Sequence, residues 1–299
     1  MGNKCGKALA ATIYGALDGT VETIFGDSVA SIEEGGSCVR VGFDHAPPRE
    51  ADLAIGADGL HSRVRQLVFG PDEKVEVSLG YHAAAFEAAG YRPRDELVYL
   101  GYGVPGRQIF RFSMREDKTL FLFAFCDEYL RGECPTNDEQ RKSVLARVFA
   151  DVGWECPQIL AAMSSASNIY YDRVSQIRLD RWTKGRTALV GDAAACVSLL
   201  AGQGSILAMA EAYVLAGELS NCGGDYGVAF VRYEQRLMPL LKRKQKSAAR
   251  FASGFAPKTA MGIAFRNLVT RLMVRLPIVV EFFLGREMRD QVELFDYGF

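Results

Sequence analysis

The sequence predicts a mixed α/β (α+β) fold in which two strand–loop–helix units lie on either side of a β-rich segment. In residues 51–70, a short apolar run is followed by a turn and by the start of a helix. In residues 187–219, an apolar strand is followed by a glycine-rich loop and a long helix of small residues. From about residue 76 to residue 126, aromatic and β-branched runs alternate with turn residues, which predicts an antiparallel sheet.

The N-terminal part is predicted to begin with a helix over 7–16. Apolar and polar residues alternate in 21–34 and in 37–44, which is typical of paired strands. The first strand–loop–helix unit follows at 51–70, and the small polar residues at 57–59 predict its turn.

The β-rich segment contains the runs "ELVYLGYG", "RQIFRFSMR" and "TLFLFAFC". Thr136 and Glu139 stand three residues apart and predict a capping box at the start of the next helix. One apolar stripe of that helix is expected to face the core: Val144, Leu145, Val148 and Phe149. Residues 169–179 then return as a strand.

Composition limits the possible classes of protein. The 299 residues are 49% hydrophobic and 24% charged, which is ordinary for a globular protein of one or two domains. A formal net charge of −1 leaves no basic excess for binding nucleic acid. Seven cysteines are scattered without a CxxC pair, and there are three histidines, so we expect a cytoplasmic protein without a disulfide framework or a metal site.

Residues 268–284 form the most apolar stretch near the C-terminus, but arginines, a proline and a glutamate interrupt it. The stretch is too short and too charged to span a bilayer. We therefore expect no membrane span and an amphipathic helix that packs against the core.

A ligand site is predicted where the second strand ends and the next helix begins. Gly191 lets the backbone pass close to a ligand, and Asp192 offers a carboxylate that accepts hydrogen bonds from hydroxyl groups. Gly202, Gln203 and Gly204 stand at a helix start, where free N–H groups and the helix dipole favour negative charge. An acid for hydroxyls beside a helix N-terminus suits a nucleotide-like cofactor. A glycine-rich loop with a solvated aspartate remains the alternative.

Two separated motifs carry a resemblance to a known family. The stretch "DLAIGADGLHSRVR" (52–65) contains an Asp-Gly motif, and "GRTALVGDAA…GQG" (185–204) contains a Gly-Asp motif. Together they resemble the two downstream fingerprints of the FAD-dependent aromatic-hydroxylase-type (class A flavoprotein) monooxygenases. "YEQRLMPLLKRKQ" (233–245) is also similar to the helix that follows the flavin domain in that family.

The resemblance implies an incomplete FAD/NAD(P)-binding Rossmann-like domain with an inserted β-sheet substrate domain and C-terminal helices. It implies a partial FAD-binding domain over 1–74, a β-rich substrate domain over 75–178 and a second FAD-binding part over 179–245. A C-terminal helical segment would cover 246–299.

The resemblance also assigns roles to the Gly-Asp motif. Asp192 would accept hydrogen bonds from the ribityl or ribose hydroxyls of FAD, and Gly191 would allow the close approach. The backbone of Gly202, Gln203 and Gly204 would lie at the pyrimidine edge of the isoalloxazine.

The Asp-Gly motif would serve the other end of the cofactor. Asp58 and Gly59 would border the FAD pyrophosphate side and the NAD(P)H path, with a simple turn-forming role as the alternative for Asp58. Arg65 would fix the turn or contact a phosphate, with a surface salt bridge as the alternative. No catalytic side chain is expected, because FAD and NAD(P)H carry the chemistry.

The implied reaction is an NAD(P)H-driven hydroxylation of a small organic substrate, with aromatic compounds as one candidate class. The substrate would lie between the isoalloxazine and the β-rich region. Six aromatic residues are candidates for its lining, although alternation places about half of them on the core side of the sheet: Tyr81, Phe86, Phe110, Phe112, Phe121 and Phe123.

The sequence also departs from the family. The opening strand, G-x-G-x-x-G turn and helix that grip the ADP half of FAD in that family do not occur ahead of the Asp-Gly motif. Ala195, Leu199 and Ile206 stand where many relatives carry other residue types. We therefore expect a chain that begins partway through such an enzyme, and its activity alone and its oligomeric state stay open. The alternatives are a non-catalytic truncated remnant and a flavoprotein reductase of the same fold.

Overall fold

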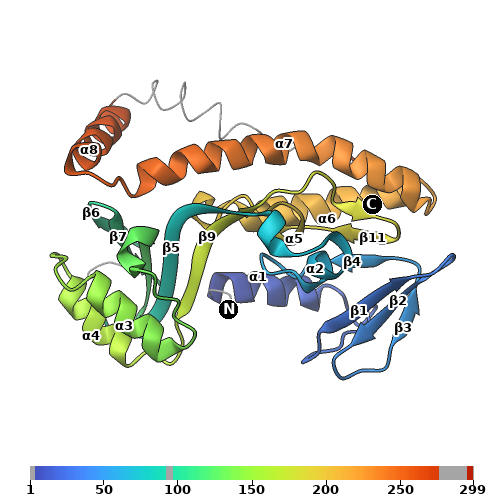
Figure 1. Cartoon of the computed structure of the whole chain (residues 1–299), viewed down its shortest axis with the longest axis horizontal. Coiled ribbons are helices and arrows are strands. Elements are labelled where there is room, and N and C mark those ends of the chain that lie inside the picture. The colour runs from blue at the N-terminus through green and yellow to red at the C-terminus, as the bar shows by residue number, and fades with distance from the viewer. Residues whose placement is uncertain (1–3, 92–96, 276–294, 299) are drawn as a thin grey trace. The chain divides into compact units, whose positions relative to one another are not determined.

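The computed structural model describes residues 4–91, 97–275 and 295–298 (Figure 1). It divides into two compact units, Met1–Ala54 and Ile55–Phe299. The predicted site residues all belong to the second unit.

The first unit contains helix α1 (Lys4–Gly15) and an antiparallel sheet in the order β1-β2-β3. Its strands are β1 (Val29–Glu34), β2 (Val39–Phe43) and β3 (Arg49–Ala51). The predicted helix and the strand pairing are confirmed, but β1 begins at Val29 rather than at residue 21. The Asp27 carboxylate explains the late start, because it accepts hydrogen bonds from the backbone N–H groups of Ser28, His45 and Ala46 and so holds a turn there.

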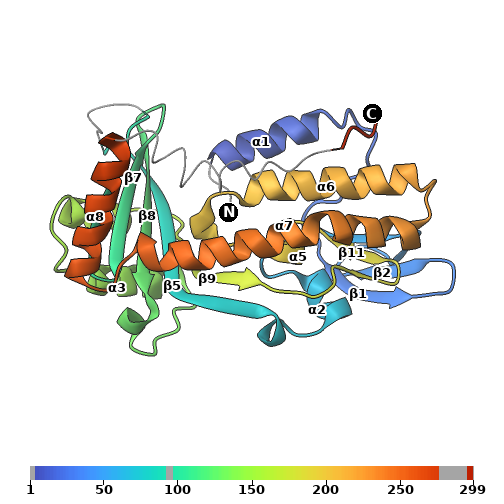
Figure 2. The ribbon, with the colours of Figure 1, turned by 90° about the horizontal axis from the view of Figure 1, so that it is seen from above.

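The second unit is built around a five-stranded sheet in the order β6-β7-β8-β5-β9, which Figure 2 shows from above. All its neighbouring strands are antiparallel, as the sequence predicts. The strands are β5 (Glu76–Ala89), β6 (Tyr99–Val104), β7 (Arg107–Ser113), β8 (Lys118–Cys126) and β9 (Tyr170–Ile177). This sheet lies within 75–178, and the assignment of that span as a substrate domain stays a prediction.

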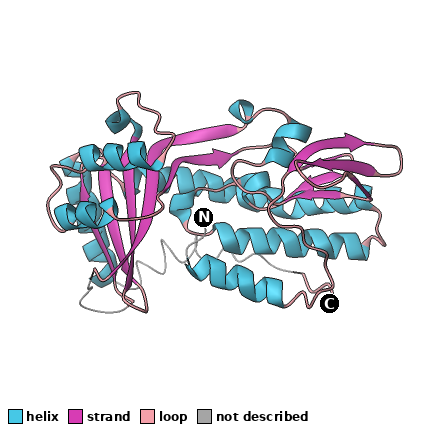
Figure 3. Cartoon of the chain, turned by 90° about the horizontal axis from the view of Figure 1, so that it is seen from below, coloured by secondary structure: helices cyan, strands magenta, loops and turns pink. Residues whose placement is uncertain are grey.

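Helices α3 (Asp138–Val148) and α4 (Cys156–Ser164) cover one face of this sheet (Figure 3). The predicted apolar stripe of α3 is confirmed, because its four residues are buried in the core cluster. Three of the six lining candidates belong to the same core: Phe86, Phe121 and Phe123.

The predicted capping box at Thr136 and Glu139 is wrong by one residue. Asn137 is the N-cap of α3, and its side chain accepts a hydrogen bond from the N–H of Gln140 at 2.9 Å. Thr136 instead donates its N–H and hydroxyl groups to the Gln140 side chain. Asparagine competes well with threonine as an N-cap, and here it stands next to it in the chain.

The long helix α7 (Tyr226–Phe255) reaches the opposite face of the sheet, and α8 (Ala260–Arg275) follows it. Tyr81 packs on this face with α7 residues Ala252 and Ala256, the latter at its C-cap. The prediction of a core-packed helix over 268–284 is wrong for its described part, because Leu268 and Leu272 are exposed on α8. Residues 276–284 of that prediction lie outside the described residues. Among the described helices, none combines the length and the apolar character that a membrane crossing needs.

A second, small sheet has the order β10-β11-β4. Its strands are β10 (Thr183–Lys184), β11 (Thr187–Leu189) and β4 (Ala54–Gly56). Around it lie helices α2 (Arg63–Phe69), α5 (Asp192–Ala195) and α6 (Gly204–Asn221), and α6 runs alongside α7 (Figure 2). Short 3₁₀ turns occupy Asp72–Lys74, Asp127–Leu130 and Leu199–Ala201.

Candidate functional site

The small sheet brings the two sequence motifs together. The carbonyl of Gly56, at the start of the Asp-Gly motif, accepts a hydrogen bond from the N–H of Val190 at 2.9 Å. A Cβ at Gly56 would lie within 3.0 Å of the side chains of Leu189 and Val64, so only glycine fits between β11 and α2. The loops that follow β4 and β11 therefore leave the sheet from adjacent strands.

Gly191 lets helix α6 approach the end of β11. Its φ of 64° and ψ of −144° lie in a region that favours glycine. A Cβ at Gly191 would come within 3.1 Å of the Cβ of Ala208 on α6. The close approach that the structure shows at Gly191 is that of helix α6, which packs directly against the loop.

The carboxylate of Asp192 is partly buried, and few protein groups stabilise its negative charge. Burial raises its pKa, and a hydrogen bond with the Cys196 thiol lowers it in part. Within the described residues it forms no ion pair. A Cβ at Gly204 would lie 3.7 Å from its Oδ1 atom, so the start of α6 is adjacent to the carboxylate. The structure thus brings Asp192 and Gly204 together across a twelve-residue separation.

The first turn of α6 has no side-chain cap, and the residue before its N-cap has open space around it. Gly202 is left-handed, with a φ of 65°, and a Cβ there would meet no atom within 4 Å. Gln203 is the N-cap residue of the 18-residue α6, and no side chain caps its first turn. Three apolar side chains stand exposed around this turn: Leu199, Ile206 and Met209. The free N–H groups and the positive end of the α6 dipole therefore lie close to these exposed apolar side chains.

Asp58 has a different environment from Asp192. Its Oδ1 atom accepts a hydrogen bond from the hydroxyl of Ser62 at 2.5 Å, and its Oδ2 atom accepts one from the N–H of Val64 at 3.1 Å. Ser62 is in turn the N-cap of α2 and accepts from the N–H of Arg65. Gly59 turns the chain with a φ of 81° and has open space around its missing Cβ. Both oxygens of Asp58 therefore hold the loop and the first turn of α2.

Arg65 is fully buried, with 0% of its surface exposed. Its guanidinium group donates to Asp72 at 2.7 and 2.9 Å and to the carbonyls of Leu60 and Ala193. Ala193 belongs to the Gly-Asp motif, so Arg65 ties the two motif loops to each other. The salt bridge considered for Arg65 exists, but it is buried rather than on the surface.

Two groups of buried polar residues support the Gly-Asp loop, and no sequence motif predicts them. Glu211 accepts a hydrogen bond from the N–H of Gly191 at 2.6 Å. Gln176 of β9 donates its side-chain amide to the carbonyls of Val197 and Gln245, and the Gln245 amide donates to those of Ile177 and Cys196. The only sequence signal was the polar character of these residues within apolar helix and strand faces.

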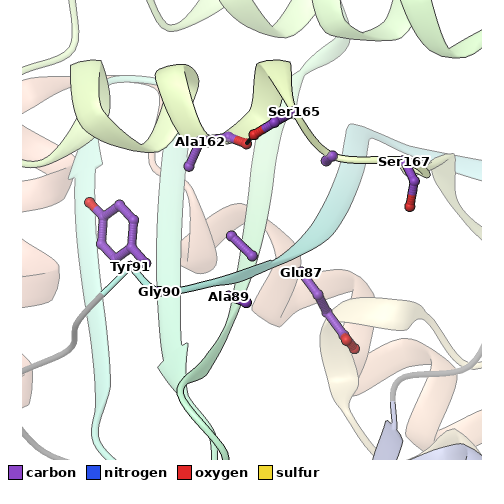
Figure 4. Close-up of a pocket in the computed structure, with 9 residues that line it drawn as sticks. Glu87, Ala89, Gly90, Tyr91, Ala162, Ser165 and Ser167 are labelled. Carbon is purple, nitrogen blue, oxygen red and sulfur yellow. Dashed lines mark hydrogen bonds between the residues drawn. The ribbon is translucent and has the colours of Figure 1, made fainter.

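Two hollows of the described residues lie away from these loops. One, of about 350 Å³, lies between the end of β5 and α4 and is lined by residues that include Glu87, Tyr91 and Ser165 (Figure 4). The other, of about 430 Å³, is lined by residues of β10 and α7, with Phe69 of α2. No residue of either motif loop lines them. Nor does the described part of the chain contain a group of three or more His, Cys, Asp or Glu residues placed to hold a metal ion.

The residues around Asp192 fit an FAD. The carboxylate supplies an acceptor for ligand hydroxyls, and the uncapped start of α6 supplies donors for a polar or anionic edge. The missing side chain at Gly202 leaves space in front of these donors. This set of groups matches a cofactor that carries both hydroxyls and a hydrogen-bonding ring.

Comparisons with known proteins indicate the same cofactor. The profile of the FAD binding domain family matches residues 18–224. An uncharacterized protein of Mycobacterium tuberculosis is 40% identical over 249 residues, which cover 83% of this chain and 67% of that protein. A flavin-dependent monooxygenase of Legionella longbeachae is 34% identical over 242 residues, covering 80% of this chain and 61% of the relative.

The chain belongs to the FAD-dependent, aromatic-hydroxylase-type monooxygenase family. The family resemblance and the fold class predicted from the sequence are therefore confirmed. The chain spans about 60% of the length of the flavin-dependent monooxygenases that it matches.

Solved structures of this family share the fold. The tetracycline destructase Tet(51) superimposes with a TM-score of 0.75 at 30% identity, over 96% of this chain and 73% of that one. Klebsiella pneumoniae HpxO in complex with FAD and uric acid superimposes with a TM-score of 0.65 over 86% of this chain and 66% of that one. HpxO is 23% identical, so this second likeness concerns the fold alone.

Proposed function

We propose that this chain binds FAD across the Gly-Asp loop and that the cofactor drives an NAD(P)H-dependent hydroxylation of a small organic substrate. One observation carries the proposal. A partly buried carboxylate, Asp192, lies beside the uncapped start of α6 and has no cation of the described chain to compensate it. A buried acid in this state requires hydrogen-bond donors, and the hydroxyls of FAD provide them.

Asp192 accepts a hydrogen bond from a ribityl or ribose hydroxyl in this proposal. The backbone of Gly202, Gln203 and Gly204 faces the pyrimidine edge of the isoalloxazine. There the dipole of α6 stabilises negative charge by about 0.3–1 kcal/mol, and by up to about 2 kcal/mol in a partly buried site. Gly191 contributes by keeping α6 close enough for Asp192 and Gly204 to act on one ligand.

The Asp-Gly loop has a positioning role. The carboxylate of Asp58 is occupied by Ser62 and Val64, so the backbone around Gly59 faces the FAD pyrophosphate side and the NAD(P)H path. Arg65 acts through the loops that it ties together rather than on a phosphate, because its guanidinium is buried and donates four hydrogen bonds to protein groups.

FAD, when bound, supplies the electron transfer from NAD(P)H and the reaction with oxygen. The protein orients the cofactor and the substrate and excludes water. The sheet face opposite α3 and α4 offers the substrate side in this proposal, with Phe110 and Phe112 as aromatic candidates on it. Phe86, Phe121 and Phe123 lie in the core under α3 and α4 and do not serve this role.

The visible absorption spectrum of the purified 299-residue chain, before and after addition of FAD and desalting, tests the proposal. We expect flavin bands at a ratio near one FAD per chain, and their loss in Asp192→Ala. Asp180→Ala is a matched control, because the Asp180 side chain is fully exposed and its contact with Lys242 is long, at 3.5 Å. A folded chain that retains no flavin would overturn the proposal.

The reaction itself is tested by the rate of NAD(P)H oxidation in the flavin-loaded chain. Tetracycline is the first compound to add, because a structural relative at 30% identity is a tetracycline destructase. We expect faster NADH or NADPH oxidation and a product that contains one additional oxygen atom for compounds that the site accepts. Oxidation without any oxygenated product, across a panel of aromatic compounds, would favour a reductase.

A further inference from the structure

Glu211 lies directly behind the Gly-Asp loop. One of its carboxyl oxygens, Oε2, accepts a hydrogen bond from the N–H of Gly191 at 2.6 Å and lies 3.4 Å from the hydroxyl of Tyr233 on α7. That hydroxyl also donates to the carbonyl of Leu189 at 3.0 Å. Glu211 is 2% exposed and Tyr233 is 0% exposed. A single carboxyl group thus contacts the loop and lies within reach of α7.

The titratable groups around Glu211 bring no positive charge. Asp192 faces it from α5 and Tyr233 faces it from α7, where Glu234 is the next acid in the chain. Within the described residues, no lysine, arginine or histidine forms an ion pair with Glu211. Burial raises the pKa of Glu211 to about 8, with a further increase from Asp192, although the Gly191 N–H and the Tyr233 hydroxyl oppose the shift.

A second acid on α6 provides a contrast. Glu218 stands two turns further along the helix and is 1% exposed. It forms an ion pair with Arg236 at 2.5 Å and accepts a hydrogen bond from Tyr297 at 2.8 Å. The charge of Glu218 is therefore compensated, whereas that of Glu211 is not.

We propose that Glu211 is a positioning residue that holds Gly191 as a neutral acid, and that its ionisation weakens FAD binding at the Gly-Asp loop. The inference rests on the proposed function, because it concerns the same cofactor site. An ionised Glu211 places a second negative charge behind Asp192, and among the described residues no cation pairs with either carboxylate. It also raises the electrostatic cost of any negative charge at the start of α6.

The test is a titration of the full chain with FAD, followed by flavin fluorescence, between pH 6 and pH 9. In the wild-type chain we expect the Kd to rise about tenfold between pH 7 and pH 9, the change that one unit of pKa linkage gives. Glu211→Gln keeps a neutral acceptor for Gly191, so its Kd should change by no more than about twofold over the same range. Glu218→Gln is the matched control and should keep the wild-type pH dependence. Equal pH dependence of the wild type and Glu211→Gln would overturn the inference.

A measurement on the chain without flavin separates this inference from the proposed function. The pKa of Glu211 in the folded chain lies above the ordinary value of 4.5. Its contribution to stability is therefore fully present below about pH 4.5 and is lost as the pH rises through about 8. In urea unfolding we expect the free energy of unfolding of the wild type to fall, relative to that of Glu211→Gln, from pH 5 to pH 9. Parallel curves would overturn the inference even where FAD binds.

Two further outcomes are informative. If neither the wild-type chain nor Glu211→Gln binds FAD at any pH, the proposed function fails, and the pH-dependent binding inferred for Glu211 fails with it. If Glu211→Gln does not fold, calorimetry of FAD binding to the wild type in two buffers at pH 8 replaces the comparison. Net proton uptake is the expected result, and uptake of no protons would overturn the inference.

Discussion

The Asp-Gly loop and the Gly-Asp loop begin from adjacent strands with the same two residue types, but they use their carboxylates differently. Both oxygens of Asp58 accept hydrogen bonds from Ser62 and Val64 within the same loop and helix. Asp192 has a thiol as its hydrogen-bonding neighbour and carries a pKa that burial raises. The Asp58 carboxylate therefore holds its own loop, whereas the Asp192 carboxylate has few protein partners among the described residues.

The glycines of the two loops differ in the same sense. Gly59 has a φ of 81° and open space around it, so glycine is needed there for its backbone conformation alone. Gly191 has a φ of 64° and also lies against Ala208 of α6, so it is needed for both conformation and space. The tolerance of each loop to substitution should reveal this difference.

The largest expected effect comes from the residue that joins the two loops. Arg65→Met leaves Asp72 without its buried partner and frees the carbonyls of Leu60 and Ala193. We expect a loss of about 3–5 kcal/mol in the free energy of unfolding. Urea denaturation measures it, and Arg63→Met on the exposed side of α2 is the control. A loss below about 1 kcal/mol would show that the loops are held by other contacts.

A smaller difference is expected between the two glycines. Gly191→Ala adds a Cβ at 3.1 Å from that of Ala208 and forces a positive φ, so we expect about 2–3 kcal/mol of destabilisation. Gly59→Ala meets only the backbone strain and should cost about 1 kcal/mol. Thermal unfolding of both variants measures the two values. Equal losses would contradict the crowding at Gly191.

The smallest expected effects on stability come from the two aspartates, and they should separate stability from binding. Asp58→Asn weakens the cap of α2 and should cost about 1 kcal/mol, with unchanged FAD retention per folded chain. Asp192→Asn should leave the stability unchanged or slightly higher, because it removes a poorly compensated buried charge, and should weaken FAD binding by about tenfold or more. Unfolding curves and flavin titrations on the same samples give both quantities. The reverse assignment of the two effects would refute the comparison.

Much of this site follows from local sequence patterns. Apolar runs that end in Gly-Asp or Asp-Gly predict strands that end in loops, and the small residues after Gly204 predict a close helix. The position of Arg65 could not be predicted, since its burial depends on Asp72 and on a carbonyl 128 residues further along the chain. The role of Glu211 depends in the same way on the fold, which places Gly191 and Tyr233 beside it.

The errors also have local causes. The N-cap of α3 is Asn137 rather than the predicted Thr136. Both adjacent residues can serve as an N-cap, and the hydrogen bond from the Gln140 N–H to Asn137 decides between them. The segment 268–275 has the composition of a core helix, but its leucines are exposed on α8. Composition indicates that a helix can be amphipathic, whereas the element that covers its apolar side is set by the fold.

The paired amides of Gln176 and Gln245 have a consequence for motion. They join β9, α7 and the segment Cys196–Val197 through four hydrogen bonds to backbone carbonyls. No one of these three elements can separate from the others without breaking several of the bonds together. Amide protons at this junction, such as that of Ile177, which donates to the carbonyl of Cys196, should therefore exchange with solvent only in a concerted opening. We expect rapid exchange of amide protons in residues 198–204 instead. The buried side of the candidate site would then be rigid, and its exposed edge would be mobile.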